Sequence, residues 1–168
     1  MLGRLYEGQE CAAARTLEIV GERWSLLILR DALFRGHTHF SDFQRSLGIA
    51  ANILARRLEV FVAAGIMKAV RTSPHPDHRE YVLTEKGQDF KPVVVALTAW
   101  GDKWRGLGPA EFVHETCGGI IRQHFHCGQC GADPPPAEVR ARPRRSVRAA
   151  HTPNPKLRKT ISSRPRRV

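Results

Sequence analysis

Residues 41–66, which read SDFQRSLGIAANILARRLEVFVAAGI, decide the fold of this chain. Ser41 with Gln44 three residues later has the form of a capping box, which predicts a short helix from Asp42 to Leu47 that ends at Gly48. A second helix is predicted from about Ala50 to Ala64, because apolar residues recur there at helical spacing. These residues are Leu54, Leu58, Phe61 and Val62. Two helices joined by a short turn form a helix-turn-helix.

Two more helices are predicted upstream of this unit. The first runs from about Glu10 to Val20, with apolar residues at helical spacing. The second runs from Trp24 to Phe34 and is apolar on most sides, so we expect it to be the buried central helix. Gly36 ends it, and residues 38–40 form a short extended link.

A hairpin and a last helix are predicted downstream. Residues 66–71 and 80–83 have strand character, and the polar segment 72–79 between them contains two prolines. Thr84 is expected to cap the next helix, and Pro92 to kink or restart it. Beyond Pro92 a wide apolar stripe follows, and the helix is expected to end at Gly106. The stripe consists of Val93, Leu97, Trp100 and Trp104.

This order of elements predicts a mainly α (α+β) domain of the winged helix-turn-helix class, with the hairpin as the wing. An α-helix fits the major groove of B-DNA, where asparagine pairs with adenine and arginine with guanine. Arg57 lies nearer the apolar edge, where it either holds a phosphate or pairs with an internal carboxylate. Protein-interaction modules that bind no DNA share this element order, so it does not decide the function alone. The predicted DNA-binding residues are Ser41, Ala51, Asn52, Ala55, Arg56, Arg57, His75, His78 and Arg79.

The strong positive charge belongs mostly to the end of the chain. The net charge is +11, but residues 134–168 hold eleven of the 27 Lys and Arg and one of the 16 Asp and Glu. The remaining 133 residues therefore carry only about +1. Seven prolines and few apolar residues predict a disordered tail there. We therefore divide the chain into an arm (1–10), the winged domain (11–108), a Cys/His-rich appendage (109–133) and the tail (134–168).

Several short motifs together resemble the HxlR family of winged helix-turn-helix regulators over about residues 11–105. The most specific part is Cys11 followed by the run from Leu17 to Phe34, with Gly21, Trp24 and Arg30 in place. The other parts are Phe40-Ser-Asp-Phe-Gln44, Leu54-Ala-Arg-Arg-Leu58, Ala64-Gly-Ile66, Tyr81-Val-Leu-Thr-Glu-Lys-Gly87 and Trp100-Gly101. Because the family varies at the start of the recognition helix, here 50–52, the resemblance implies no particular operator.

The resemblance implies a repressor or activator that works as a homodimer, with the first and last helices pairing across the two-fold axis. The stripe on the last helix agrees with this, since it is wider than one small domain needs; the alternative is that it packs inside its own chain. The predicted dimerisation residues are Leu17, Val93, Leu97, Trp100 and Trp104.

Cys11 matches the cysteine at the start of the family pattern. In some members this residue senses oxidants, quinones or aldehydes, so the resemblance makes Cys11 a candidate redox sensor with a small-molecule or electrophile effector. The alternative is a buried thiol that acts as a small hydrophobic residue.

The appendage carries two pairs of metal-ligating residues, His114 with Cys117 and Cys127 with Cys130. Four such ligands at this spacing are what tetrahedral Zn²⁺ requires, and a segment with little core gains stability from a structural metal. His124 and His126 are rival ligands. The alternatives are a reduced, metal-free segment or a Cys127–Cys130 disulfide.

The composition argues against several other classes. No stretch approaches the length of a membrane span, and the start lacks the apolar run of a secretory signal. No acid–base pair or nucleophile–base spacing favours an enzyme. We therefore predict a cytoplasmic, nucleoid-associated regulator that binds double-stranded DNA. The alternatives are a sensor regulator that uses Cys11, or a non-specific nucleic-acid binder driven by the basic tail.

Overall fold

The computed structural model describes residues 11–72 and 79–143. The chain divides into two compact units, Met1–Gln123 and His124–Val168. Within the described ranges, no helix combines the length and apolar character needed to cross a membrane.

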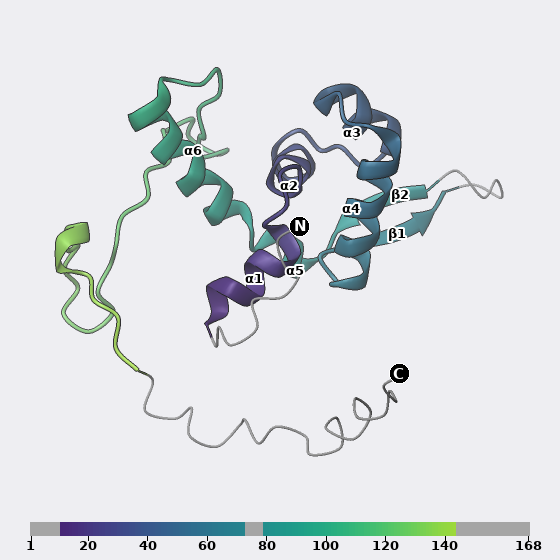
Figure 1. Ribbon diagram of the computed structural model, residues 1–168. Helices are drawn as coiled ribbons and strands as arrows, with labels where there is room; N and C mark the ends of the chain where they lie inside the picture. Colours follow the sequence, from purple (N-terminus) through teal and green to yellow (C-terminus); the bar gives the residue numbers. More distant parts are fainter. Residues whose placement is uncertain (1–10, 73–78, 144–168) are drawn as a thin grey trace, which may run out of the picture. The chain divides into compact units, whose positions relative to one another are not determined.

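The first unit has the element order of a winged helix-turn-helix domain, which confirms the predicted fold class (Figure 1). The two strands pair antiparallel, in a register that sets Met67 opposite Leu83 and Arg71 opposite Arg79. The elements are α1 (Ala12–Val20), α2 (Ser25–Phe34), α3 (Phe40–Leu47), α4 (Ala51–Ala63), β1 (Met67–Arg71), β2 (Arg79–Leu83), α5 (Glu85–Gln88) and α6 (Lys91–Arg105).

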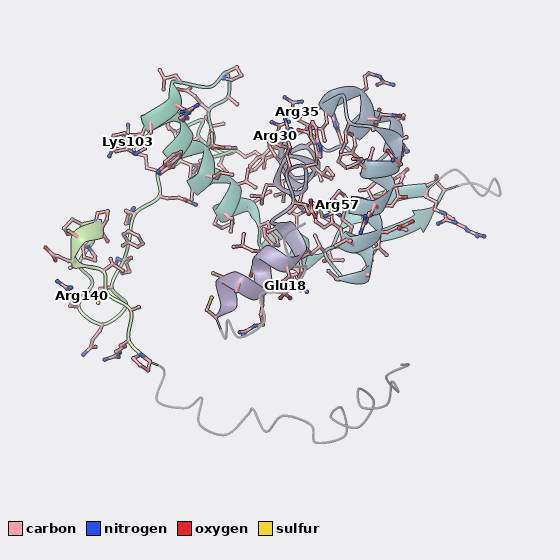
Figure 2. The ribbon with its side chains drawn as sticks, viewed as in Figure 1. Glu18, Arg30, Arg35, Arg57, Lys103 and Arg140 are labelled. Atoms are coloured by element: carbon pink, nitrogen blue, oxygen red, sulfur yellow. The ribbon has the colours of Figure 1, made fainter. Side chains whose placement is uncertain are left out.

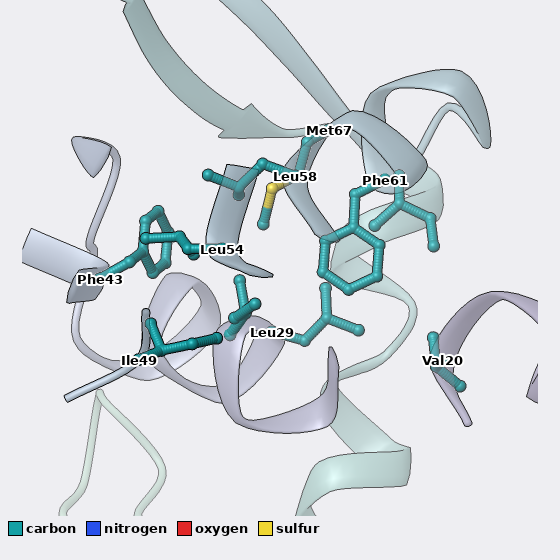
Figure 3. Close-up of a cluster of buried hydrophobic side chains, with 10 residues drawn as sticks. Val20, Leu29, Phe43, Ile49, Leu54, Leu58, Phe61 and Met67 are labelled. Atoms are coloured by element: carbon teal, nitrogen blue, oxygen red, sulfur yellow. The ribbon is translucent and has the colours of Figure 1, made fainter. Parts of the chain in front are cut away.

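The core of this unit lies where α2, α3 and α4 meet the start of β1 (Figure 3). Ile28 and Leu29 of α2 are fully buried, as the apolar character of that helix predicts. From α4, every third or fourth residue faces inward, so one side of the helix is committed to the core. The buried residues of α4 are Leu54, Leu58 and Phe61.

The prediction that Ser41 caps α3 is wrong. The helix begins two residues earlier than predicted, at Phe40, and His39 occupies the cap position without a side-chain bond. His39 is held instead by the sheet, because it pairs with Glu80 as an isolated bridge and the Thr38 carbonyl accepts from the Tyr81 N–H at 2.7 Å. A tertiary contact to β2 therefore sets the start of α3, which a local pattern cannot show.

The end of α3 follows the prediction. Gly48 adopts φ +61°, a left-handed conformation that glycine tolerates best, and its N–H bonds to the Gln44 carbonyl at 2.9 Å. The turn buries Ile49 in the core, so α3 and α4 are held at a fixed angle.

The wing is fastened to α4 through the segment after β2. Thr84 caps α5, as predicted, and its hydroxyl also donates to the Gly65 carbonyl at 2.7 Å. Lys86 Nζ donates to the Ala64 carbonyl at the end of α4, at 2.7 Å. Pro92 lies in the first turn of α6, which confirms that the proline restarts the helix.

The second unit contains a cysteine turn and a short 3-10 helix, η1 (Pro136–Glu138). The helix lies at the start of segment 134–168, for which the sequence predicted disorder and no helix. Residues 144–168 lie outside the described residues, so the rest of that prediction stays untested.

Candidate nucleic-acid interface

One face of α4 packs into the core, and the opposite face points outward. Ala51, Asn52 and Arg56 are exposed and Ala55 is half-buried. Asparagine and arginine are the side chains that read adenine and guanine bidentately, and small alanines let a helix approach the bases closely. The structure thus presents these four predicted residues together on one surface.

The N-terminus of α4 is suited to a phosphate. Its cap residue, Ala50, offers no side-chain acceptor, and the helix has no acidic residue in its first turn. Asn52 Oδ1 accepts from the Ile53 N–H at 3.0 Å, so its amide nitrogen remains available for a base. Backbone N–H groups at an uncapped helix start attract anions.

Arg57 lies close to a carboxylate of its own chain, although that carboxylate is exposed and not internal. Its side chain is only 11% exposed, and Nη1 lies 3.8 Å from Glu22 Oε1. Arg57 therefore links α4 to the segment before α2, and its contact with a phosphate stays a prediction.

The wing carries an arginine pair that sequence reasoning missed. Arg79 was predicted, and the register sets it opposite Arg71, with both side chains exposed. Like charges directly opposite each other destabilise a strand pair, and a bound phosphate would relieve this repulsion. Only the strand register could have identified Arg71. His75 and His78, also predicted here, lie outside the described residues.

The first helix of the motif adds two exposed polar residues. Ser41 is exposed at the start of α3, and Arg45 is exposed one turn later. Sequence reasoning missed Arg45, which forms a 3.3 Å ion pair with Asp42. Such an exposed pair is weak enough to be exchanged for a phosphate contact.

Comparison with known proteins places this geometry in a family. The HxlR-like helix-turn-helix family model matches residues 19–108. The chain belongs to the HxlR-like helix-turn-helix family. It is 40% identical over 135 residues to the uncharacterised HTH-type transcriptional regulator Rv3095 of Mycobacterium tuberculosis, covering 79% of this chain and 84% of the relative. It is 33% identical over 99 residues to the regulator YtfH of Escherichia coli, covering 58% of this chain and 77% of YtfH.

Solved structures agree with this assignment. PA1607, a candidate transcription factor, has a TM-score of 0.70 and 37% identity, covering 80% of this chain and 96% of its own. The reduced form of the redox regulator HypR has a TM-score of 0.52 and 27% identity, covering 56% of this chain and 94% of its own. The chain is therefore a helix-turn-helix transcriptional regulator, and its named relatives are regulators rather than enzymes.

This HxlR-like protein exposes the whole apolar stripe of α6. Its four residues are between 47% and 63% exposed, although valine, leucine and tryptophan gain most from burial. Leu17 of α1 is 45% exposed. The alternative that the stripe packs inside its own chain is therefore not what the structure shows. The exposed stripe residues are Val93, Leu97, Trp100 and Trp104.

Cys11 is exposed rather than buried, so the interpretation as a small core residue is wrong. It occupies the cap position of α1, where Sγ accepts from the Ala14 N–H at 3.3 Å. An exposed thiol at a helix start is accessible to an oxidant or electrophile.

The two predicted ligand pairs adopt the same backbone turn. In each, the first ligand's N–H bonds to the carbonyl five residues on, and its carbonyl accepts from the N–H four residues on, all at 2.8 Å. The N–H acceptors are Gly119 for His114 and Ala132 for Cys127. In both turns the residue four positions after the first ligand is a glycine with positive φ, Gly118 at +70° and Gly131 at +72°.

Each turn brings its own two side chains together. His114 Nδ1 lies 3.2 Å from Cys117 Sγ. In the other turn, the backbone N–H groups of Cys130 and then Gln129, followed by the Cys130 thiol, lower the pKa of Cys127. Among the described side chains, no three His, Cys, Asp or Glu residues are grouped as a metal site. The pairs belong to different units, and zinc binding stays a prediction.

Proposed function

We propose that this protein is a sequence-specific regulator that binds double-stranded DNA as a homodimer in the cytoplasm, with α4 in the major groove and the wing on the flanking backbone. One observation carries the proposal: Asn52 and Arg56 are exposed on the face of α4 that lies opposite its buried residues. The core therefore fixes the direction in which these two side chains point.

The homodimer is proposed from the exposed stripe of α6. Two copies that bury this stripe, together with Leu17 of α1, would remove large apolar side chains from water. A two-fold dimer also presents two recognition helices to neighbouring turns of one duplex, which matches half-sites of an inverted repeat.

Selection of bound sequences from random double-stranded DNA, with the full chain, tests this function. We expect one enriched motif with dyad symmetry. Asn52→Ala and Arg56→Ala should each cost about 1–3 kcal/mol and relax the preference at their own base position. Arg122→Ala, which removes an exposed arginine outside the motif, should bind as the parent does. Failure to enrich any motif, or unchanged preference in both variants, would overturn the proposal.

Redox or electrophile sensing is a second candidate, favoured by the exposed thiol of Cys11. Its measurement is the loss of DNA binding after treatment with diamide or a quinone. Cys11→Ser should bind DNA like the parent and keep that binding after treatment. A Cys11→Ser variant that responds like the parent removes this candidate.

We also propose that His114, Cys117, Cys127 and Cys130 bind a structural Zn²⁺. The support is the backbone turn that the two pairs share. Each turn offers two ligands and has glycine at the position where φ is positive. Protein purified under reducing conditions should contain about one zinc per chain. Cys117→Ser and Cys130→Ser should lower that content, while Cys11→Ser should not. Reduced protein without zinc would overturn this proposal.

A further inference from the structure

A cavity of about 720 Å³, partly open to solvent, lies in the first unit, away from α4 and the wing. The C-terminal end of α2 and the first half of α6 form two of its sides, and the segment 108–123 forms a third. This volume is in the range of sites that enclose a small organic molecule. Its apolar walls include Phe34, Pro92, Val95, Phe112 and Ile121.

Three contacts hold the cavity in shape without a ligand. The Phe34 and Phe112 rings pack at 4.6 Å between centroids, tilted by 51°. Gln123 Nε2 donates to the Pro92 carbonyl at 2.9 Å. The Gly108 N–H donates to Asp102 Oδ1 at 2.8 Å, which fastens the segment to α6 at its other end. A preformed cavity costs less to fill than one that must open.

Basic side chains outnumber acidic ones around this cavity. Arg30, Arg35 and Lys91 line it, against Glu111 alone among the lining residues. Figure 2 shows Arg30 and Arg35 close together at α2. Behind them lies Asp31, a fully buried carboxylate 2.7 Å from Arg30 Nη2 and 3.6 Å from Arg35 Nε. Because one carboxylate is shared by two guanidinium groups, it neutralises only one of them, and the side chains around the cavity keep a net positive charge.

We propose that this cavity binds an aromatic carboxylate, with the ring against Phe34 and Phe112 and the carboxylate at Arg35 and Lys91. An aromatic ligand can add an offset or edge-to-face contact with either ring, which an aliphatic chain cannot, and guanidinium binds carboxylate in a planar fork. A ligand in the cavity leaves the apolar stripe of α6 free for the dimer. Val95 lines the cavity and lies two residues from Val93 of the stripe, so the two side chains point about 200° apart around the helix.

The same arginine connects the cavity to the helix-turn-helix. Arg35 Nη1 donates to Ser46 Oγ at 2.6 Å, and Ser46 Oγ donates to Asp31 Oδ2 at 2.6 Å. Ser46 belongs to α3, the first helix of the DNA-binding motif. A ligand carboxylate that draws Arg35 into the cavity removes one of the bonds that hold α3 against α2. The ligand therefore weakens DNA binding, and DNA weakens ligand binding by the same factor.

The binding step is tested by calorimetry on the full chain without DNA. The probes are naphthalene-2-carboxylate, 3-phenylpropanoate and indole-3-carboxylate, with naphthalene-2-carboxamide as the uncharged match. We expect at least one acid to bind with a Kd below about 1 mM, and the amide to bind about tenfold or more weakly than its acid. Phe112→Ala and Arg35→Gln should weaken binding, whereas Arg45→Gln, on α3 outside the cavity, should not.

Absence of binding by all three acids overturns the proposal, and so does binding that neither cavity variant changes. Absence of binding is also the result expected if a partner's segment occupies the cavity. The regulatory step rests on the proposed DNA binding and is measured separately, as the loss of affinity for the selected operator when the acid is added. Ser46→Ala should still bind the acid but lose this response. If the protein binds no DNA, the proposed function fails while the calorimetry still decides the cavity.

Discussion

Gly87 is a residue where a single methyl group should be costly. A Cβ at this position would collide with the Ile66 carbonyl and lie 2.8 Å from Leu83 Cδ2. The colliding group is backbone at the junction of α4 and β1, so it cannot move without displacing the wing. Gly87→Ala should destabilise the fold by about 1–3 kcal/mol, measured by urea unfolding.

The matched control is Gly128→Ala, because a Cβ there meets no atom within 4 Å and φ is not positive. It should leave the unfolding midpoint where it is in the parent. Equal midpoints for Gly87→Ala and the parent would show that the close approach of β1 to α5 does not exist in solution.

Cys127 should have the pH dependence of a stabilised thiolate. The N–H groups of Cys130 and Gln129 lower its pKa below that of an ordinary thiol. A lowered folded-state pKa contributes stability that is present above the unfolded pKa and is lost as the pH falls through the folded pKa. Because the thiolate is the reactive form, the alkylation rate of Cys127 in metal-stripped protein, read by peptide mass, should rise with pH through a midpoint below that of the unfolded chain. In urea the midpoint should rise to that of an ordinary thiol. The same midpoint in both would contradict the turn geometry.

We expect α6 to form the dimer interface. Leu97 is 51% exposed on its own chain, so a charge there leaves the fold intact while opposing burial against a partner. Leu97→Asp should weaken the dimer by about 2 kcal/mol or more and give a monomer in sedimentation velocity. Val139→Asp changes another exposed apolar side chain, 48% exposed in the second unit, and should remain dimeric. A Leu97→Asp dimer would show that the interface lies elsewhere.

The elements themselves were largely readable from the sequence, for a physical reason. Apolar spacing in α2 and α4 and the cap at Thr84 depend on neighbours a few residues away, so local patterns predicted these helices. The failures depend on distant contacts. His39 replaces Ser41 as the cap of α3 because β2 holds it, and Arg71 becomes a candidate contact only through its pairing with Arg79. The cavity behind Arg35 depends on a segment some eighty residues further along, which no spacing rule reaches.

Both α4 and the basic tail could contribute to DNA binding by the full chain, and they would contribute differently to affinity and to sequence preference. The segment 134–168 carries eleven basic residues and one acidic residue, while the rest of the chain is close to neutral. Basic residues that neutralise phosphates give affinity that is independent of sequence and falls steeply with salt. Base contacts from α4 give preference that salt changes much less. The two contributions can therefore be separated by deleting the tail.

A chain ending at residue 133 should bind its selected operator with a shallower dependence of log K on log salt, because each lost phosphate contact removes about 0.9 from the slope. The ratio of operator to random-DNA affinity should stay the same or rise, since the lost contacts serve both sequences equally. Fluorescence anisotropy over a salt series measures both quantities, with the full chain as control. If the shortened chain binds neither DNA, the tail supplies the binding and the exposed face of α4 does not read sequence.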